Sequence, residues 1–141
     1  WERTSFANRD GAKEFVGTHA ALWGIAAGVY LASMGPQGLK ELGEAIVQRQ
    51  AALRKALSGI KGISLNKFSG TPFEEFVVDF SASGKSVEEI NAKLLEKGIL
   101  GGYSLEEHYP ELKGCALYCV TEQTTAEDIK ALVSELGEIL G

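Results

Sequence analysis

The stretch GILGGYSLEEHYPELKGCALYCVTE, residues 98–122, decides how the rest of the chain is interpreted. Its glycine cluster at residues 98–102 is unfavourable in a helix, and Tyr109-Pro110 indicates a turn. The apolar run at residues 116–121 then predicts a buried strand. Loops of this length between regular elements often carry binding residues.

Helices are predicted on both sides of this stretch. Ser86 and Glu89 fit a capping box before it, and Thr124 and Glu127 fit another after it. Apolar residues spaced three and four apart then continue each helix. They are Val87, Ile90 and Leu94 in the first helix and Ile129, Leu132, Val133, Leu136, Ile139 and Leu140 in the second.

Two further strands are predicted upstream. Residues 74–80 alternate, with Phe76, Val78 and Phe80 on one face, and residues 63–65 predict a short edge strand. With the strand at residues 116–121, these give a small three-stranded sheet. The element order predicts an α+β fold in which helices cover one face of that sheet.

Two more helices precede the sheet. The first starts at Thr18 and is apolar nearly all round, which predicts burial on several sides. Gly35-Pro36 ends it and starts an amphipathic second helix, which Gly59 closes. The longest apolar stretch, residues 19–34, is broken by Gly24 and Gly28 and falls short of the roughly 20 residues of a membrane-spanning helix.

Composition narrows the class of protein. With 141 residues, 45% of them hydrophobic, the chain suffices for one ordinary domain with a core. Its net charge of -5 and pI of about 5.1 disfavour nucleic acid as a partner. Cys115 and Cys119 lie about 13 Å apart if they share one strand, too far for a disulfide. Reduced thiols favour a cytoplasmic location.

Few residues suggest chemistry of their own. His19 and His108 lack a metal-ligand spacing, and no metal site is expected. Thr18 and His19 lie at a helix N-terminus, where Thr18 caps the helix or the free N–H groups bind an anion. Cys119, inside an apolar strand, is interpreted as a packed and unreactive thiol.

The glycines and the end of the last strand remain as binding candidates. Gly98 is interpreted as a helix C-cap, with unusual dihedral angles at Gly101 and Gly102, rather than as part of a phosphate loop. Glycines also let a ligand approach the backbone. Thr121 and Glu122 are either turn and cap residues or substrate contacts at a strand end.

The motif order GILGG, an aromatic residue, YPEL and a strand ending in VTE resembles subunit 1 of the decarboxylating glycine dehydrogenase, the glycine cleavage P-protein, in its C-terminal part. FEEFVVDF and VYLASMGPQGLKEL extend the resemblance, which covers most of the chain from about Gly17 onward. It implies that residues 17–141 form the small C-terminal domain of an aminotransferase-type, fold type I, pyridoxal phosphate enzyme. Residues 1–16 would be a linker or a remnant of a missing large domain.

The resemblance also implies a function for the full enzyme. It would decarboxylate glycine with pyridoxal phosphate and pass the aminomethyl group to the lipoyl arm of the H-protein, in partnership with glycine dehydrogenase subunit 2. The cofactor lysine would lie in the large domain or the partner subunit, so this chain alone is expected to be inactive and to bind no cofactor. Residues expected near the cleft are Thr18, His19, Gly101, Gly102, Tyr103, Thr121 and Glu122.

Other interpretations stay open at this point. A small sheet with helices on one face also suits a stand-alone small-molecule-binding or regulatory module, or a structural subunit of an assembly. A homodimer is compatible with each of them.

Overall fold

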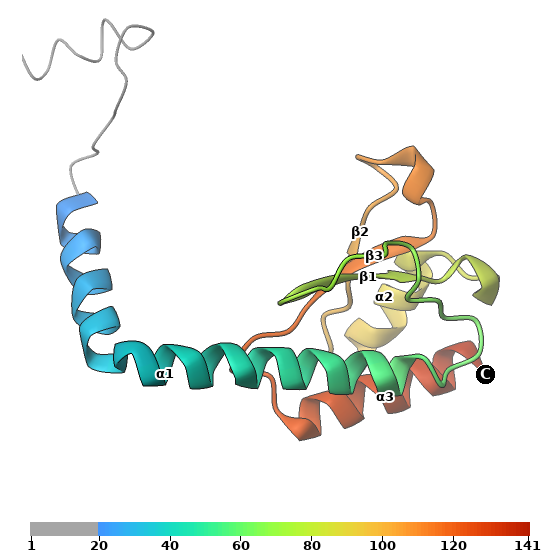
Figure 1. Ribbon diagram of the computed structural model, residues 1–141. Helices are drawn as coiled ribbons and strands as arrows, with labels where there is room; N and C mark the ends of the chain where they lie inside the picture. The colour runs from blue at the N-terminus through green and yellow to red at the C-terminus, as the bar shows by residue number, and fades with distance from the viewer. Residues whose placement is uncertain (1–19) are drawn as a thin grey trace, which may run out of the picture. The chain divides into compact units, whose positions relative to one another are not determined.

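The computed structural model describes residues 20–141 (Figure 1). The chain divides into two compact units at Lys40 and Glu41. The predictions for residues 1–16 and for Thr18 and His19 lie outside the described residues.

Helix α1 spans Ala20–Leu57 and is kinked at Gly35. Gly35 has φ 61° and ψ 179°, a conformation that is open essentially to glycine only, and Pro36 after it has no N–H to continue the helical hydrogen bonds. The predicted end of one helix and start of the next at Gly35-Pro36 is therefore confirmed.

The apolar side chains of residues 20–31 are exposed in this chain. Trp23, for example, is 73% exposed. The group consists of Leu22, Trp23, Ile25, Val29, Tyr30 and Leu31. The described residues 20–141 therefore do not supply the predicted burial on several sides, because an all-round apolar pattern does not say which polypeptide covers it. Within residues 20–141, no helix combines the length and hydropathy of a bilayer-spanning segment.

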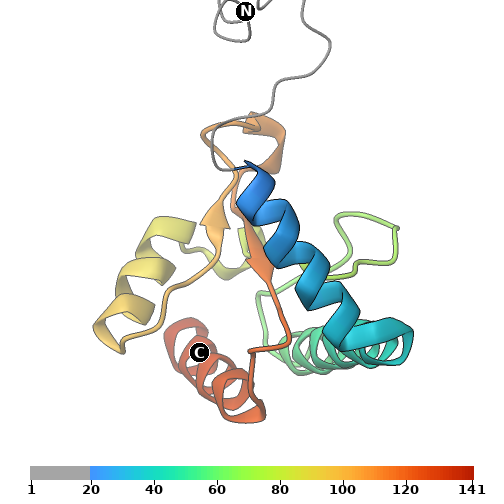
Figure 2. The same ribbon diagram turned by 90° about the vertical axis from the view of Figure 1, so that its left-hand side faces the viewer.

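The second unit contains a three-stranded antiparallel sheet in the order β1-β3-β2, with its strands labelled in Figure 1 and the arrows of β2 and β3 seen from another side in Figure 2. Its strands are β1 (Glu75–Asp79), β2 (Tyr103–Ser104) and β3 (Cys115–Cys119). The predicted number of strands is confirmed, but residues 63–65 are not the third. Only Ser64 pairs with β1, through two 2.9 Å hydrogen bonds to Asp79. The third strand is β2, which is too short to show an alternating pattern in the sequence.

One face of the sheet packs against helices, as predicted (Figure 1). Residues 41–57 of α1, together with α2 (Val87–Glu96) and α3 (Ala126–Leu140), supply this cover. The core residues from the sheet are Phe76, Val78, Phe80, Ala116, Tyr118 and Val120, and those from the helices are Leu53, Leu57, Val87, Ile90, Leu94 and Leu136. The predicted inward face of residues 76–80 is thus confirmed.

Both predicted capping boxes occur, one of them shifted. Ser86 Oγ accepts from the Glu89 N–H at 3.2 Å, and Glu89 Oε2 accepts from the Ser86 N–H at 2.9 Å. At α3 the box is formed by Thr125 and Asp128, so the prediction of Thr124 and Glu127 is one residue off. Thr124 instead accepts from the Thr121 N–H at 3.2 Å and closes the preceding turn.

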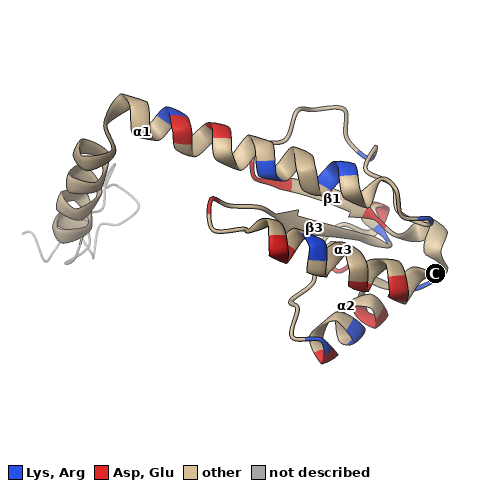
Figure 3. Ribbon diagram, turned by 90° about the horizontal axis from the view of Figure 1, so that it is seen from below, with Lys and Arg blue, Asp and Glu red and all other residues tan. Residues whose placement is uncertain are grey.

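The surface carries both signs of charge. Figure 3 shows acidic and basic residues interspersed along α3 and along the part of α1 in the second unit. The Tyr109-Pro110 turn is a short 3-10 helix, η4 (Pro110–Leu112), and a second one, η3 (Ser81–Ser83), follows β1.

Candidate functional site

The glycine cluster ends α2 and leads into β2. Gly98 has φ 74°, and its N–H donates to the Leu95 carbonyl at 2.9 Å while that of Ile99 donates to the Leu94 carbonyl at 2.9 Å. This is the left-handed helix ending that the C-cap interpretation predicts. Gly98 therefore ends α2 as the left-handed residue directly after the C-cap residue Lys97, which is one position earlier than the predicted cap, rather than forming part of a phosphate loop.

Gly101 and Gly102 serve close packing. Neither has a positive φ, so the prediction of unusual dihedral angles at these two positions is wrong. A Cβ atom would overlap the Asn91 amide at Gly101 and the Tyr118 ring at Gly102. Asn91 Nδ2 also donates to the Gly102 carbonyl at 2.7 Å. The two glycines thus bring the chain close to α2 and β3.

Tyr103 and His108 form an exposed pair on the loop after Gly102. The Tyr103 hydroxyl and His108 Nε2 lie 2.8 Å apart, and the two rings stack with centroids 6.2 Å apart. Both residues are exposed. Sequence reasoning singled out each residue separately but missed the pair, because a spacing of five residues in a loop matches no regular structure.

Thr121 and Glu122 lie in the turn between β3 and α3. Thr121 Oγ1 accepts from the Gln123 N–H at 3.2 Å, and the Glu122 carbonyl accepts a hydrogen bond from Arg49 Nη1 of α1. The Thr121 side chain and the Glu122 backbone therefore hold the turn. The Glu122 side chain is exposed.

The sheet register brings these two groups of candidates to the same end of the sheet. Tyr103 pairs with Leu117, so Gly102 and Gly101 lie along the last residues of β3, from which Thr121 and Glu122 follow. His108 contacts Tyr103 but lies on the loop at the other end of β2, since Leu105 bonds to Cys115 at the start of β3. The described residues expected at a cleft thus gather at one end of the sheet, with the Tyr103 and Glu122 side chains exposed.

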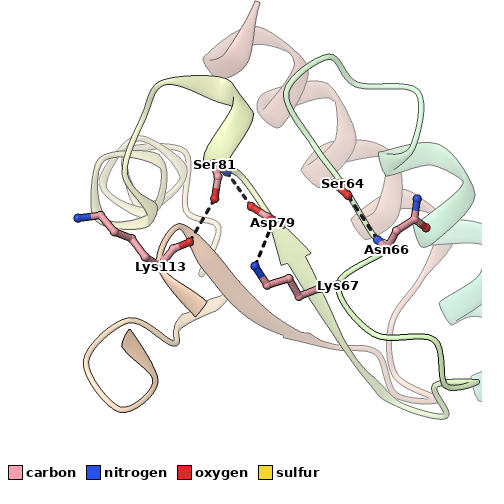
Figure 4. A network of polar contacts seen from close by, with 6 residues as sticks. All are labelled: Ser64, Asn66, Lys67, Asp79, Ser81 and Lys113. Carbon is pink, nitrogen blue, oxygen red and sulfur yellow. Dashed lines mark hydrogen bonds and ion pairs between the residues drawn. The ribbon is translucent and has the colours of Figure 1, made fainter. Parts of the chain in front are cut away.

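A polar network at the Asp79 end of β1 links the strand to Lys67 before it and, through Ser81, to Lys113 (Figure 4). Asp79 accepts from the Ser81 N–H at 2.9 Å and lies 3.7 Å from Lys67 Nζ, and Ser81 Oγ donates to the Lys113 carbonyl at 3.1 Å. Burial opposes ionisation, but the Ser81 hydrogen bonds and the Lys67 charge together lower the pKa of Asp79. This cluster stabilises the fold.

The two cysteines differ in exposure. Cys115 is buried, whereas Cys119 is exposed, so the prediction of a packed thiol at Cys119 is wrong. Cys119 is the last residue of β3 and lies on the face opposite the helices. Desolvation, with the charges of Glu74 and Glu75, raises its pKa, and burial raises the pKa of Cys115. Because the thiolate is the nucleophile, neither environment favours reactivity.

The described residues offer no enclosed cofactor anchor. A pyridoxal phosphate site needs a lysine held in a pocket to form the Schiff base. None of the lysines within residues 20–141 is buried. The same residues contain no group of three His, Cys, Asp or Glu side chains placed to hold a metal ion.

Comparisons with family models, curated proteins and solved structures agree on one protein family. A family model described as "Glycine cleavage system P-protein" matches residues 2–136, so the resemblance also covers most of residues 1–16. The chain is 41% identical to the probable glycine dehydrogenase (decarboxylating) subunit 1 of Thermococcus onnurineus, over 97% of this chain and 29% of the relative. It is 39% identical to the same subunit of Pyrococcus furiosus, over 98% and 30%.

A solved structure shows the same fold. The crystal structure of a glycine decarboxylase (P-protein) of the glycine cleavage system, in inhibitor-bound form, aligns with a TM-score of 0.79 and 28% identity. The alignment covers 96% of this chain and 30% of that chain. The chain thus spans about 30% of the length of the relatives it matches. Because the family model matches nearly every residue, the chain belongs to the glycine cleavage system P-protein family.

Proposed function

We propose that these 141 residues are the C-terminal small domain, with its connecting helices, of a glycine dehydrogenase (decarboxylating) subunit 1. The observation that carries this proposal is the asymmetric coverage, 97% of this chain against 29% of a relative 41% identical to it. The full protein, with subunit 2, decarboxylates glycine and passes the aminomethyl group to the lipoyl H-protein. The electron withdrawal for decarboxylation is supplied by pyridoxal phosphate bound outside the described residues.

The exposed helix supports the same proposal. Six large apolar side chains between Leu22 and Leu31 are exposed, and contiguous apolar surface of this kind marks an interaction site. A stand-alone module would need a polar surface there. Residues 20–34 therefore pack against the larger remainder of the protein.

In this proposal the small domain helps to close the cleft of the full enzyme. The described candidates that contribute are those gathered at one end of the sheet, namely Gly101, Gly102, Tyr103, Thr121 and Glu122. Thr18 and His19 lie outside the described residues and stay candidates from the sequence alone. The glycines position the Tyr103 loop through their close packing. Tyr103 and its neighbour His108, on the loop at the other end of β2, add exposed polar groups.

The test compares the full-length protein with this chain. Each is mixed with subunit 2, lipoylated H-protein and pyridoxal phosphate, and release of labelled CO₂ from carboxyl-labelled glycine is measured. The full-length protein should release CO₂, and the 141-residue chain should release none above the blank. Activity of the short chain, or inactivity of the full-length protein, would overturn the proposal.

A further inference from the structure

Within residues 20–141, the outer edge of β1 has backbone groups without a hydrogen-bond partner. Along an antiparallel strand, every second residue directs its backbone N–H and C=O groups toward the neighbouring strand. The Glu74 carbonyl accepts from the Val120 N–H and the Phe80 N–H donates to the Gly114 carbonyl, so the even-numbered residues of β1 bond to β3. Glu75, Val77 and Asp79 therefore direct their N–H and C=O groups outward. Of these three residues, only Asp79 has a backbone partner on that side within residues 20–141, namely Ser64.

The chain before β1 turns away from this edge. Had the pairing of Ser64 with Asp79 continued, Asn66 would have come opposite Val77. Instead the Asn66 N–H donates to Ser64 Oγ at 3.4 Å. Residues 65–72 form a loop, and a solvent-open cavity of about 330 Å³ separates them from the strand. Its apolar lining includes Leu65, Phe68, Pro72, Val77 and Leu117.

A cationic side chain without a partner lines the same cavity. Arg54 of α1 is half-buried, its Nε atom is buried without a hydrogen bond, and its guanidinium forms no ion pair within residues 20–141. Glu75 also lines the cavity but makes no ion pair with Arg54. A desolvated guanidinium is best satisfied by a carboxylate, which accepts two parallel hydrogen bonds.

We propose that an extended segment of the polypeptide beyond these 141 residues adds to the sheet at β1 as a fourth strand, with an Asp or Glu side chain on Arg54. The occupant is extended, because open N–H and C=O groups on a strand edge pair with another strand. It is acidic, because Arg54 is the cationic residue lining the cavity.

The source of the strand follows from the length of the relatives. The inference rests on the proposed function, since about 70% of the relatives' length lies outside the aligned part. A segment of the same polypeptide is present at a high effective concentration and needs no separate binding event. The resulting strand order is new strand-β1-β3-β2.

Amide hydrogen exchange tests the inference in the full-length protein. The Val77 amide should exchange at least about tenfold more slowly there than in the 141-residue chain, because it gains a hydrogen bond. The Asp79 amide is the internal control, since its bond to Ser64 is present in both. Equal Val77 exchange in the two proteins would overturn the inference. Val77 protection that rises with concentration of the short chain would also overturn it, because a second copy would then be the occupant.

A variant pair tests the acidic side chain. In the full-length protein, Arg54→Gln should speed Val77 exchange about tenfold, the effect of losing a charge-assisted hydrogen bond. Lys55→Gln, at the exposed neighbouring residue, is the matched control and should leave Val77 unchanged. Slow Asp79 exchange shows that each variant is folded. Unchanged Val77 exchange in Arg54→Gln would contradict the inference.

The fourth strand and the proposed reaction can be refuted independently of each other. Fast Val77 exchange in a full-length protein that releases CO₂ from glycine refutes only the fourth strand. Slow Val77 exchange in a full-length protein without that activity refutes only the proposed reaction.

Discussion

Gly102 lies so close to Tyr118 that a single added methyl group would overlap the tyrosine ring. This contact holds the loop before β2 against β3 and directs the chain into Tyr103 and the candidate site. Burial of the Tyr118 side chain raises its pKa to about 12, and the nearby Gly102 backbone offsets only part of this rise. Gly102 therefore packs tightly against an aromatic ring, which is rigid and cannot bend away from an added methyl group.

Gly102→Ala should therefore destabilise the chain. Overpacking of a rigid contact costs about 1–3 kcal/mol of unfolding free energy, which urea denaturation measures. Gly43→Ala is the matched control, because Gly43 lies in helix α1 with open space around its Cα. That variant should gain about 0.5–1 kcal/mol from helix propensity. Equal stability changes in the two variants would contradict the close packing of Gly102.

The shifted capping box at α3 predicts a specific cost at Thr125. Thr125→Ala should lower the unfolding free energy by about 1 kcal/mol, because it leaves an N–H at the start of α3 without its acceptor. Thr71→Ala, in an exposed loop, is the control and should change stability by less than about 0.5 kcal/mol. A loss no larger at Thr125 than at Thr71 would argue against this cap.

Asp79 predicts a pH dependence of stability. Its pKa is lowered in the folded state, so the unfolded state binds the proton more tightly. Its contribution is then fully present above the ordinary value of 3.8 and is lost as the pH falls through the lower, folded value. The difference in unfolding free energy between the wild type and Asp79→Asn should shrink below about pH 4. A difference that stays constant down to pH 2 would contradict this account.

A double-variant cycle can check the role of Lys67 in that effect. Lys67→Met should lower the unfolding free energy more in the wild-type background than in Asp79→Asn, because the two side chains interact. Equal effects in both backgrounds would show that Lys67 acts independently of Asp79.

The exposed apolar helix predicts self-association of the short chain. Light scattering coupled to gel filtration should show oligomers of the 141-residue chain that dissociate when Trp23 and Val29 are both changed to Glu. Leu100→Glu is the control, because Leu100 is 85% exposed in a loop outside the helix, and it should not change the oligomers. A wild-type chain that remains monomeric at every concentration would contradict an interaction surface on residues 20–31.

Periodic features of the fold could be predicted from the sequence. Alternation gave the inward face of β1, and the Ser86 and Glu89 pair marked the start of α2. The start of α3 was ambiguous, because Thr124 with Glu127 and Thr125 with Asp128 both have capping-box spacing. The two-residue strand β2 has no pattern to detect.

The remaining features depend on contacts between distant segments. The role of Gly102 requires Tyr118, and the exposure of Cys119 depends on which segments pack over its end of β3, since Cys115 on the same face is buried. The open edge at Val77 depends on where residues 65–72 turn away from β1. Sequence periodicity describes one segment at a time and does not contain such relationships.

The intact mass of the native protein decides whether these 141 residues are part of a longer glycine dehydrogenase subunit. The protein can be found in its own cells through a peptide containing EEFVVDF, residues 74–80. The account predicts a mass more than three times the 15.1 kDa of this chain, since the chain covers 29% of a relative's length. A native mass of 15.1 kDa would contradict it.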